Sequence, residues 1–103
     1  MYCTIMYMVP VSFDWNEGNR DKNWVKHMMS TKECEEAFFN KPHIIAPDPD
    51  HSKNERRYSL LGTTNSRRLV RIIYTIRNDS IRVISARDQS KKERSIYEKT
   101  KKA

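Results

Sequence analysis

The chain has 103 residues and carries 20 Lys/Arg against 13 Asp/Glu, a formal net charge of +7 at pH 7. This length suits a single domain over residues 1–103 with one modest core and excludes two independent cores. No apolar run approaches the ~20 residues that cross a membrane, and the N-terminus lacks the pattern of a signal peptide. We therefore expect a cytoplasmic protein.

The charge is divided unevenly along the chain. Residues 1–52 hold five Lys/Arg and eight Asp/Glu, a net charge of −3, whereas residues 53–103 hold fifteen and five, a net charge of +10. Such a basic half indicates a polyanionic partner. Nucleic acid fits better than a membrane surface, because no basic helix has a broad apolar face.

The cysteines and histidines do not indicate a metal site. Cys3 and Cys34 lie far apart, and His27, His43 and His51 are scattered. Neither set has the spacing of zinc ligands. We expect reduced thiols, no metal and no cofactor.

The N-terminal region predicts an extension or edge strand followed by a helix. Residues 1–12 are apolar and β-prone but contain Pro10, which is tolerated in an edge strand and not in a central one. Asn16 is a suitable N-cap for a first helix that runs to about His27.

A second helix has a stronger start signal. Ser30 and Glu33 form the S-x-x-E pattern of a capping box, and Met29 and Cys34 occupy the positions of a hydrophobic staple. The helix is expected to end before Pro42.

Short strands and a third helix follow. Residues 43–46 predict a strand, residues 47–50 predict a turn, and residues 55–61 predict another strand. Near the C-terminus, Ser90 and Glu93 form a second capping box, which starts a helix rich in lysine.

The stretch 67–87 predicts the β-hairpin around which the fold is arranged. Its first half alternates, so that Val70, Ile72, Tyr74 and Ile76 point one way and Leu69, Arg71, Ile73, Thr75 and Arg77 the other. Asn78 and Asp79 supply a turn pair that tolerates positive φ. One face is fit for a core. The other carries arginines, which either hold phosphate or form a solvated outer face.

These elements predict an α+β fold. We expect an antiparallel sheet of three to five strands with two N-terminal helices and one C-terminal helix. The helices are expected on one face of the sheet and the arginines on the other.

Several motifs over residues 13–98 carry a family resemblance. The most specific is IRVISAR at 81–87, followed by E-R-x-x-Y at 93–97, and the supporting motifs are FDWN at 13–16, KH at 26–27 and DPDHS at 48–52. Together they resemble the BrnT toxins, with residues 1–12 and a basic tail at 99–103 outside the match.

This resemblance implies a ribonuclease toxin of a type II toxin–antitoxin system with a small RelE-like fold. It also implies a BrnA-like antitoxin encoded alongside. The expected assembly contains two toxins and two antitoxins and binds operator DNA through the antitoxin.

The residues offer groups for cleaving RNA without a metal. RNA carries its own nucleophile, the 2′-OH, so an enzyme needs a base, cationic donors for the phosphate oxygens and an acid for the leaving oxygen. The candidate phosphate donors are Arg56, Arg77, Arg82 and Arg87. The candidates for proton transfer are His51, Glu55 and Tyr97, with His27 weaker.

Further basic residues are candidates for RNA binding, namely Arg57, Arg71, Lys91, Lys92 and Arg94. Other interpretations stay open for single residues, because Glu55 could simply pair with Arg57 or Arg82, and Tyr97 could belong to the core. Two alternatives concern the basic, arginine-rich surface as a whole. It could bind nucleic acid without cutting it, or bind an acidic antitoxin segment after catalysis has been lost.

Overall fold

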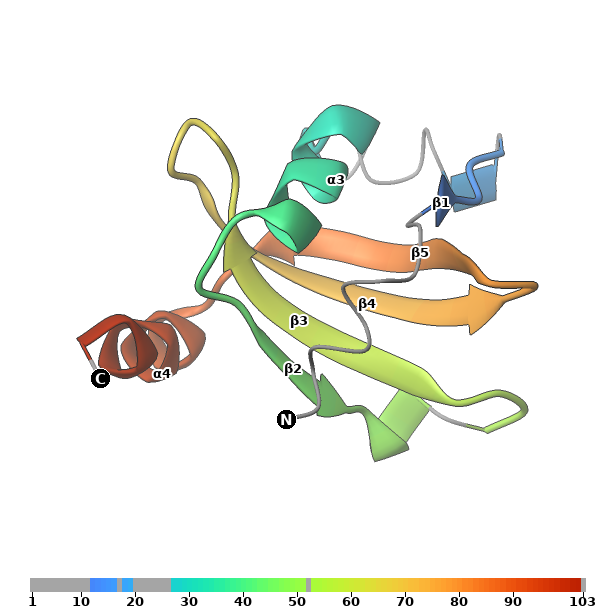
Figure 1. Cartoon of the computed structure of the whole chain (residues 1–103). Coiled ribbons are helices and arrows are strands. Elements are labelled where there is room, and N and C mark those ends of the chain that lie inside the picture. The colour runs from blue at the N-terminus through green and yellow to red at the C-terminus, as the bar shows by residue number, and fades with distance from the viewer. Residues whose placement is uncertain (1–11, 17, 20–26, 52, 103) are drawn as a thin grey trace.

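The computed structural model describes residues 12–16, 18–19, 27–51 and 53–102, without the side chains of His51, Lys101 and Lys102. A five-stranded sheet in the order β1-β5-β4-β3-β2 organises the molecule (Figure 1). The strands are β1 (Ser12–Phe13), β2 (Ile44–Pro47), β3 (Arg57–Thr63), β4 (Leu69–Arg77) and β5 (Ser80–Asp88). β1 runs parallel to β5 and the other neighbours are antiparallel, so the expectation of a wholly antiparallel sheet is wrong.

The described residues contain two α-helices, α3 (Thr31–Phe39) and α4 (Lys91–Lys102), and a short 3₁₀ helix, η1 (Pro49–His51). Three α-helices were expected. Most of the first one, expected over residues 16–27, lies outside the described residues, as does the possible extension before residue 12. The overall α+β class is confirmed.

α3 begins as predicted. The Ser30 side chain accepts a hydrogen bond from the Glu33 amide at 3.1 Å, and the Glu33 carboxylate accepts one from the Ser30 amide at 3.0 Å. This capping box satisfies two amides that the first turn would leave without partners. The helix packs so closely on β3 that a Cβ on Gly62 would lie 3.1 Å from the Ala37 carbonyl oxygen. A larger residue at this position would push the helix or the Leu60 side chain away by a few tenths of an ångström, so the close packing favours glycine.

The central hairpin is also confirmed. β4 and β5 pair antiparallel, and the turn between them places Asn78 at φ 51° and Asp79 at φ 65°. Both residue types tolerate this left-handed conformation better than most others, and such a turn matches the twist of the flanking strands.

The hydrophobic core lies between α3 and one face of the sheet. The alternating residues Val70, Ile72 and Tyr74 point into it as predicted, whereas Ile76 is 52% exposed. The remaining members of the core are Met29, Cys34, Ala37, Leu60, Val83 and Ala86. The opposite face of the sheet carries the arginines together with the buried side chains of Leu61 and Ile73.

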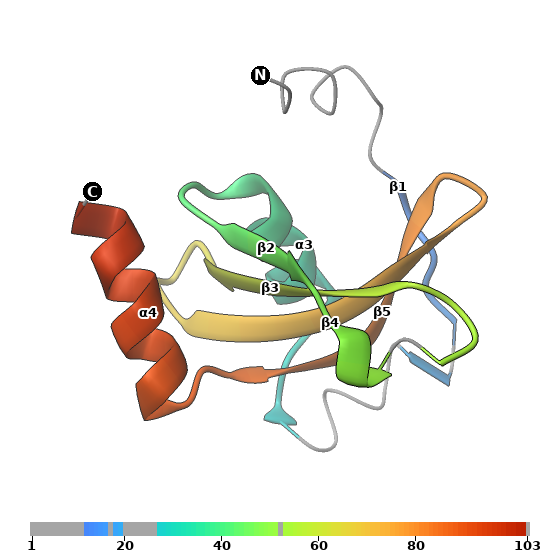
Figure 2. The same cartoon turned by 90° about the horizontal axis from the view of Figure 1, so that it is seen from below.

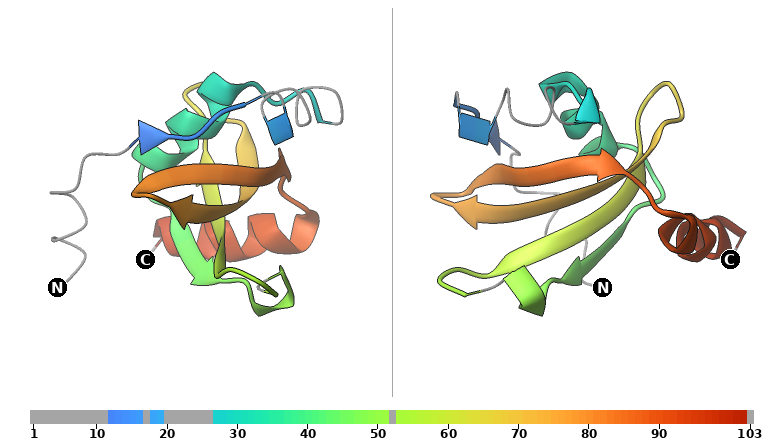
Figure 3. Two further views of the ribbon diagram at one scale, coloured as in Figure 1. Left: turned by 90° about the vertical axis from the view of Figure 1, so that its right-hand side faces the viewer. Right: turned by 180° about the vertical axis from the view of Figure 1, so that it is seen from behind.

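α4 lies on the other side of the sheet from α3, beside the end at which β3 finishes (Figures 2 and 3). Its capping box is confirmed, because the Ser90 amide donates to Glu93 at 2.8 Å and the Glu93 amide donates to Ser90 at 3.2 Å. Tyr97 anchors the helix, since its ring is buried and its hydroxyl donates to the Pro42 carbonyl at 2.7 Å. The expectation that all helices share one face is therefore wrong for α4.

Candidate functional site

Five arginines share the sheet face that does not contact α3. The register pairs Arg57 with Thr75, Thr75 with Arg82, and Arg71 with Arg87. Directly opposed residues in a sheet point to the same side, and so do residues two or four apart along a regular strand. We call this set the arginine face, and it consists of Arg57, Arg71, Arg77, Arg82 and Arg87.

A β-bulge makes this grouping possible. Arg82 and Arg87 are five positions apart, so a regular strand would point them to opposite faces. The register shifts between Ile73 and Tyr74, which places Ile84 as an extra residue in β5. The bulge reverses the alternation after Val83, and both arginines reach the same face.

At the end of the sheet that holds the β4–β5 turn, Glu55 and Asp14 hold three of these arginines. Arg77 donates to both carboxylate oxygens of Glu55, at 3.0 and 2.8 Å, and Arg57 lies 3.7 Å from the same carboxylate. Arg82 donates to Asp14 at 3.3 Å. Asp14 reaches this face because it directly follows Phe13, the residue of β1 that pairs with β5.

Near α4, Glu93 pairs with the other two arginines of the arginine face, Arg87 and Arg71. Arg87 donates to both oxygens of Glu93, at 2.8 and 3.0 Å, and Arg71 lies 3.2 Å from Glu93. The buried Asp48 lies 3.9 Å from Arg71 on its other side. Burial alone would raise the pKa of Glu93, but hydrogen bonds from Arg87 and the Ser90 amide and the charges of Arg87 and Arg71 outweigh it and lower the pKa to about 2.

Every member of the arginine face therefore lies within 4 Å of a carboxylate. These ion pairs fix the guanidinium groups in place before any ligand arrives. An arginine has five N–H donors, so one that gives two to a carboxylate still has donors for a phosphate. The face can thus bind polyanions through oriented cations.

The candidates for proton transfer lie in different places. Glu55 is on the arginine face, and hydrogen bonds from Arg77 lower its pKa, so it is ionised at neutral pH. Tyr97 lies in the interface beneath α4, and burial together with the charge of Glu98 raises its pKa. That position supports its alternative assignment to the core. His51 lies in η1, and its side chain is outside the described residues.

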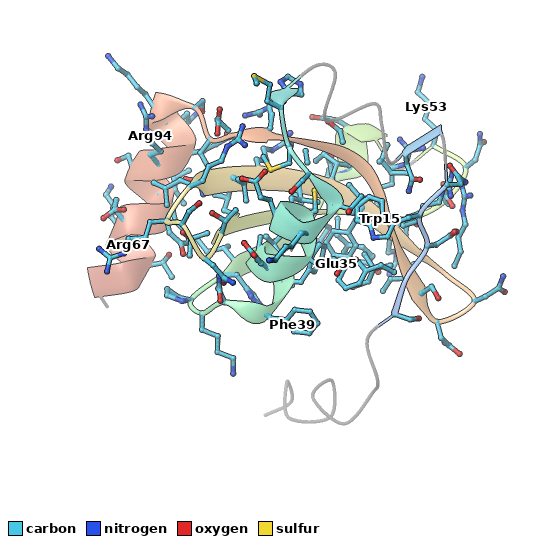
Figure 4. All side chains as sticks on the ribbon, turned by 90° about the horizontal axis from the view of Figure 1, so that it is seen from above. Trp15, Glu35, Phe39, Lys53, Arg67 and Arg94 are labelled. Atoms are coloured by element: carbon cyan, nitrogen blue, oxygen red, sulfur yellow. The ribbon has the colours of Figure 1, made fainter. Side chains whose placement is uncertain are left out.

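The remaining basic candidates flank the face. Arg56 does not lie with the other arginines, because it precedes Arg57 by one position and lines an open pocket with Tyr58 instead. The exposed Lys91, Lys92 and Arg94 are on the first turn of α4. Figure 4 shows Arg94 and Lys53 at opposite ends of the molecule.

Sequence reasoning missed several residues that build this site. Asp14 was not a candidate, and the DPDH stretch was interpreted as a turn, so Asp48 was not assigned to the site either, although each lies beside one of the arginines. It also missed Arg68, which donates to Asp88 at 2.6 Å and to the His27 carbonyl at 2.7 Å, and which lies 3.3 Å from Glu33. Nothing in the local sequence distinguishes Arg68 from its neighbour Arg67.

Two further features bear on the kind of site. Among the described residues, no three His, Cys, Asp or Glu side chains lie close enough together to hold a metal ion. No helix in the described part of the chain is long and apolar enough to cross a membrane.

The chain is thus a small α+β domain with a core on one side of its sheet and five ion-paired arginines on the other. Comparison with protein families makes this specific. The model described as "Ribonuclease toxin, BrnT, of type II toxin-antitoxin system" matches residues 15–93, and the chain belongs to this family. A search of curated proteins finds no match. The predicted resemblance is confirmed, and all five arginines of the arginine face lie within the matched residues.

Proposed function

We propose that this toxin cleaves RNA without a metal, by attack of a 2′-OH on the adjacent phosphate. The arginine face stabilises the negative charge that develops on the phosphate oxygens, chiefly through Arg77, Arg82 and Arg87. The gathering of five oriented arginines on one sheet face carries this proposal. Preoriented donors of this kind contribute more to catalysis than mobile ones, because they need no reorganisation in the transition state.

Glu55 is the proposed base. It is ionised at neutral pH and lies among the arginines, although both of its oxygens accept hydrogen bonds from Arg77. A carboxylate with a lowered pKa is a weak base, so the chemistry depends mostly on the arginines. His51, four positions earlier in the chain, is proposed as the acid that protonates the leaving 5′-oxygen.

A BrnA-like antitoxin is the proposed partner. In this proposal two toxins and two antitoxins assemble in the cytoplasm, and the antitoxin carries the operator-binding surface. Membership of a type II toxin–antitoxin family supports an antitoxin partner.

The test is incubation of the purified chain with labelled single-stranded RNA in EDTA. We expect cleavage that leaves a 2′,3′-cyclic phosphate, and no cleavage where the attacking 2′-OH is replaced by hydrogen. Arg82→Ala is expected to lower the rate by about 10²-fold, the cost of removing one transition-state donor.

Arg67→Asn is the matched control. Arg67 is exposed, outside the arginine face and at φ 70°, a conformation that Asn tolerates. This variant should cleave at the wild-type rate. If intact, folded wild type leaves RNA uncut both with and without ribosomes, the proposed catalysis is wrong.

One observation favours a second function, which is nucleic-acid binding without cleavage. Every arginine of the arginine face is paired with a carboxylate, and Tyr97 is buried, so it cannot reach an RNA substrate on that face. In that case the chain would bind RNA with a salt-dependent affinity and leave it intact.

A further inference from the structure

A pocket lies at the end of the sheet that holds the β4–β5 turn, and Tyr58 in its wall opposes Tyr74 and so points to the α3 side of the sheet. It has a volume of about 650 Å³ and is open to solvent, and its walls come from Pro47, Pro49, the loop 53–56 and Tyr58. This volume falls within the ~300–1,000 Å³ that is usual for small-molecule sites. Nothing in the proposed cleavage mechanism uses the pocket itself.

The apolar part of the pocket offers flat surfaces of fixed orientation. The ring of Tyr58 stacks on that of Tyr74, with centroids 5.4 Å apart and an interplanar angle of 29°. Tyr74 is itself packed edge-on against Phe38 in the core. Because the core holds Tyr74, it also holds the plane of Tyr58. A fixed aromatic ring beside proline rings is a surface on which a nucleobase can stack.

The polar part offers cations that are not compensated. Lys53 and Arg56 are exposed, and within the described chain neither forms an ion pair. They differ in this respect from the arginines of the arginine face, each of which lies beside a carboxylate. Free cations beside an aromatic ring are the combination by which proteins hold single-stranded nucleic acid.

Glu55 connects the pocket with the arginine face. Its side chain lines the pocket, and its two oxygens accept hydrogen bonds from Arg77. Because Tyr58 points to the α3 side of the sheet, a strand of RNA with one phosphate among the arginines would pass around the end of the sheet at Glu55 to reach the pocket. This continuity favours an RNA strand over a peptide as the occupant.

We propose that this pocket binds one unstacked nucleotide of a single-stranded RNA, next to the phosphate held by the arginine face. Its base stacks on Tyr58, and its phosphate contacts Lys53 and Arg56. The proposal rests on the proposed function in that the neighbouring phosphate is the one cleaved. It assigns Arg56 to substrate binding instead of to the chemical step.

The experiment measures binding without cleavage. A fluorescein-labelled hexanucleotide with 2′-O-methyl groups at every position cannot supply a nucleophilic 2′-OH, and its affinity is measured by anisotropy at several salt concentrations. Lys53→Ala and Arg56→Ala are each expected to weaken binding several-fold and to reduce the slope of log K against log salt by about 0.7. Lys32→Ala, an exposed lysine on α3, is the matched control and should bind as wild type does.

The stacking role is tested separately. Tyr58→Leu should weaken binding about ten-fold, within the range measured for loss of one base–aromatic stack, whereas Tyr58→Phe keeps the ring and should restore it. Circular dichroism and thermal unfolding identify any variant that fails to fold. Lys53→Ala and Arg56→Ala still provide the test in that case, because neither side chain is buried.

The outcomes separate this proposal from the proposed catalysis. If wild type cleaves RNA but the pocket variants bind the hexanucleotide as tightly as Lys32→Ala does, the pocket proposal is refuted and catalysis stands. If wild type does not cleave but the pocket variants lose binding, the pocket is a nucleic-acid site and the proposed catalysis fails. Should the variants lose affinity for the antitoxin and not for the hexanucleotide, the pocket belongs to the protein partner and the proposal is overturned.

Discussion

Replacing Glu93 by glutamine should reveal how strongly the carboxylates support the arginine face. Glu93 accepts two hydrogen bonds from Arg87, lies 3.2 Å from Arg71 and completes the capping box of α4 through the Ser90 amide. Glutamine has nearly the same shape. It keeps an acceptor for the cap but removes the charge that both arginines face.

The expected cost at pH 7 is about 1–2 kcal/mol in the free energy of unfolding. The Glu93 and Arg71 side chains are each 20% exposed and that of Arg87 is 33% exposed, so solvent screens these ion pairs only in part. Exposed pairs contribute ~0.2–1 kcal/mol each, and weakening of the cap adds to this. In a domain of this size such a loss lowers the melting temperature by roughly 4–16 °C.

The difference should depend on pH in a defined direction. The pKa of Glu93 falls from 4.5 to about 2 on folding. A carboxyl group with a lowered pKa contributes stability above its unfolded pKa and loses it as the pH falls through its folded pKa. The difference in unfolding free energy between wild type and Glu93→Gln should therefore be largest above about pH 4.5 and should disappear as the pH approaches 2.

Urea unfolding at several pH values between 2.5 and 7 measures this difference. Asp50→Asn is the control, because Asp50 is exposed and forms no ion pair with any other described residue, so the variant should follow wild type closely. A difference that stays constant over this pH range would show that Glu93 is not ion-paired in the folded protein.

Three further variants test other parts of the structure. Tyr97→Phe removes the hydrogen bond to the partly buried Pro42 carbonyl and should lower the free energy of unfolding in urea by about 0.5–1.5 kcal/mol while RNA cleavage persists; loss of cleavage without loss of stability would restore a catalytic role for Tyr97. In a Cys3→Ser background, Ellman's reagent at pH 8 should leave the folded protein unlabelled, because burial raises the pKa of the Cys34 thiol to about 12, and rapid labelling would place Cys34 at the surface. Arg68→Ala removes donors from Asp88 and two carbonyl groups and should cost about 2–3 kcal/mol; a melting temperature equal to that of wild type would contradict this.

The features that the sequence predicted well are local ones. Both capping boxes join residues three positions apart, and the Asn78–Asp79 turn depends on the conformations open to those two residues. The alternation over residues 70–74 also correctly placed Val70, Ile72 and Tyr74 in the core and Arg71 on the other face. In each case the interacting groups are neighbours in the chain, so their spacing contains the necessary information.

The features that the sequence did not predict depend on distant residues. Asp14 meets Arg82 only because β1 adds to the edge of the sheet beside β5. Tyr97 has no local signal that distinguishes a buried anchor from a catalytic group, and its environment depends on where α4 docks. Arg56 and Arg57 look equivalent in the sequence, yet one lines the pocket and the other lies on the arginine face.

The bulge at Ile84 links the fold to the proposed chemistry. It turns Arg87 to the same face as Arg82, and the two then differ in how many donors their carboxylates occupy. Arg87 gives donors to Glu93 and to the Asp88 carbonyl, whereas the one side-chain hydrogen bond of Arg82 within the described residues goes from Nη1 to Asp14. Arg82 therefore keeps the larger share of its donors for a phosphate. In the proposed mechanism, Arg82 should therefore contribute more to phosphate binding than Arg87 does. Its partner Asp14 should be the carboxylate that a phosphate displaces most easily.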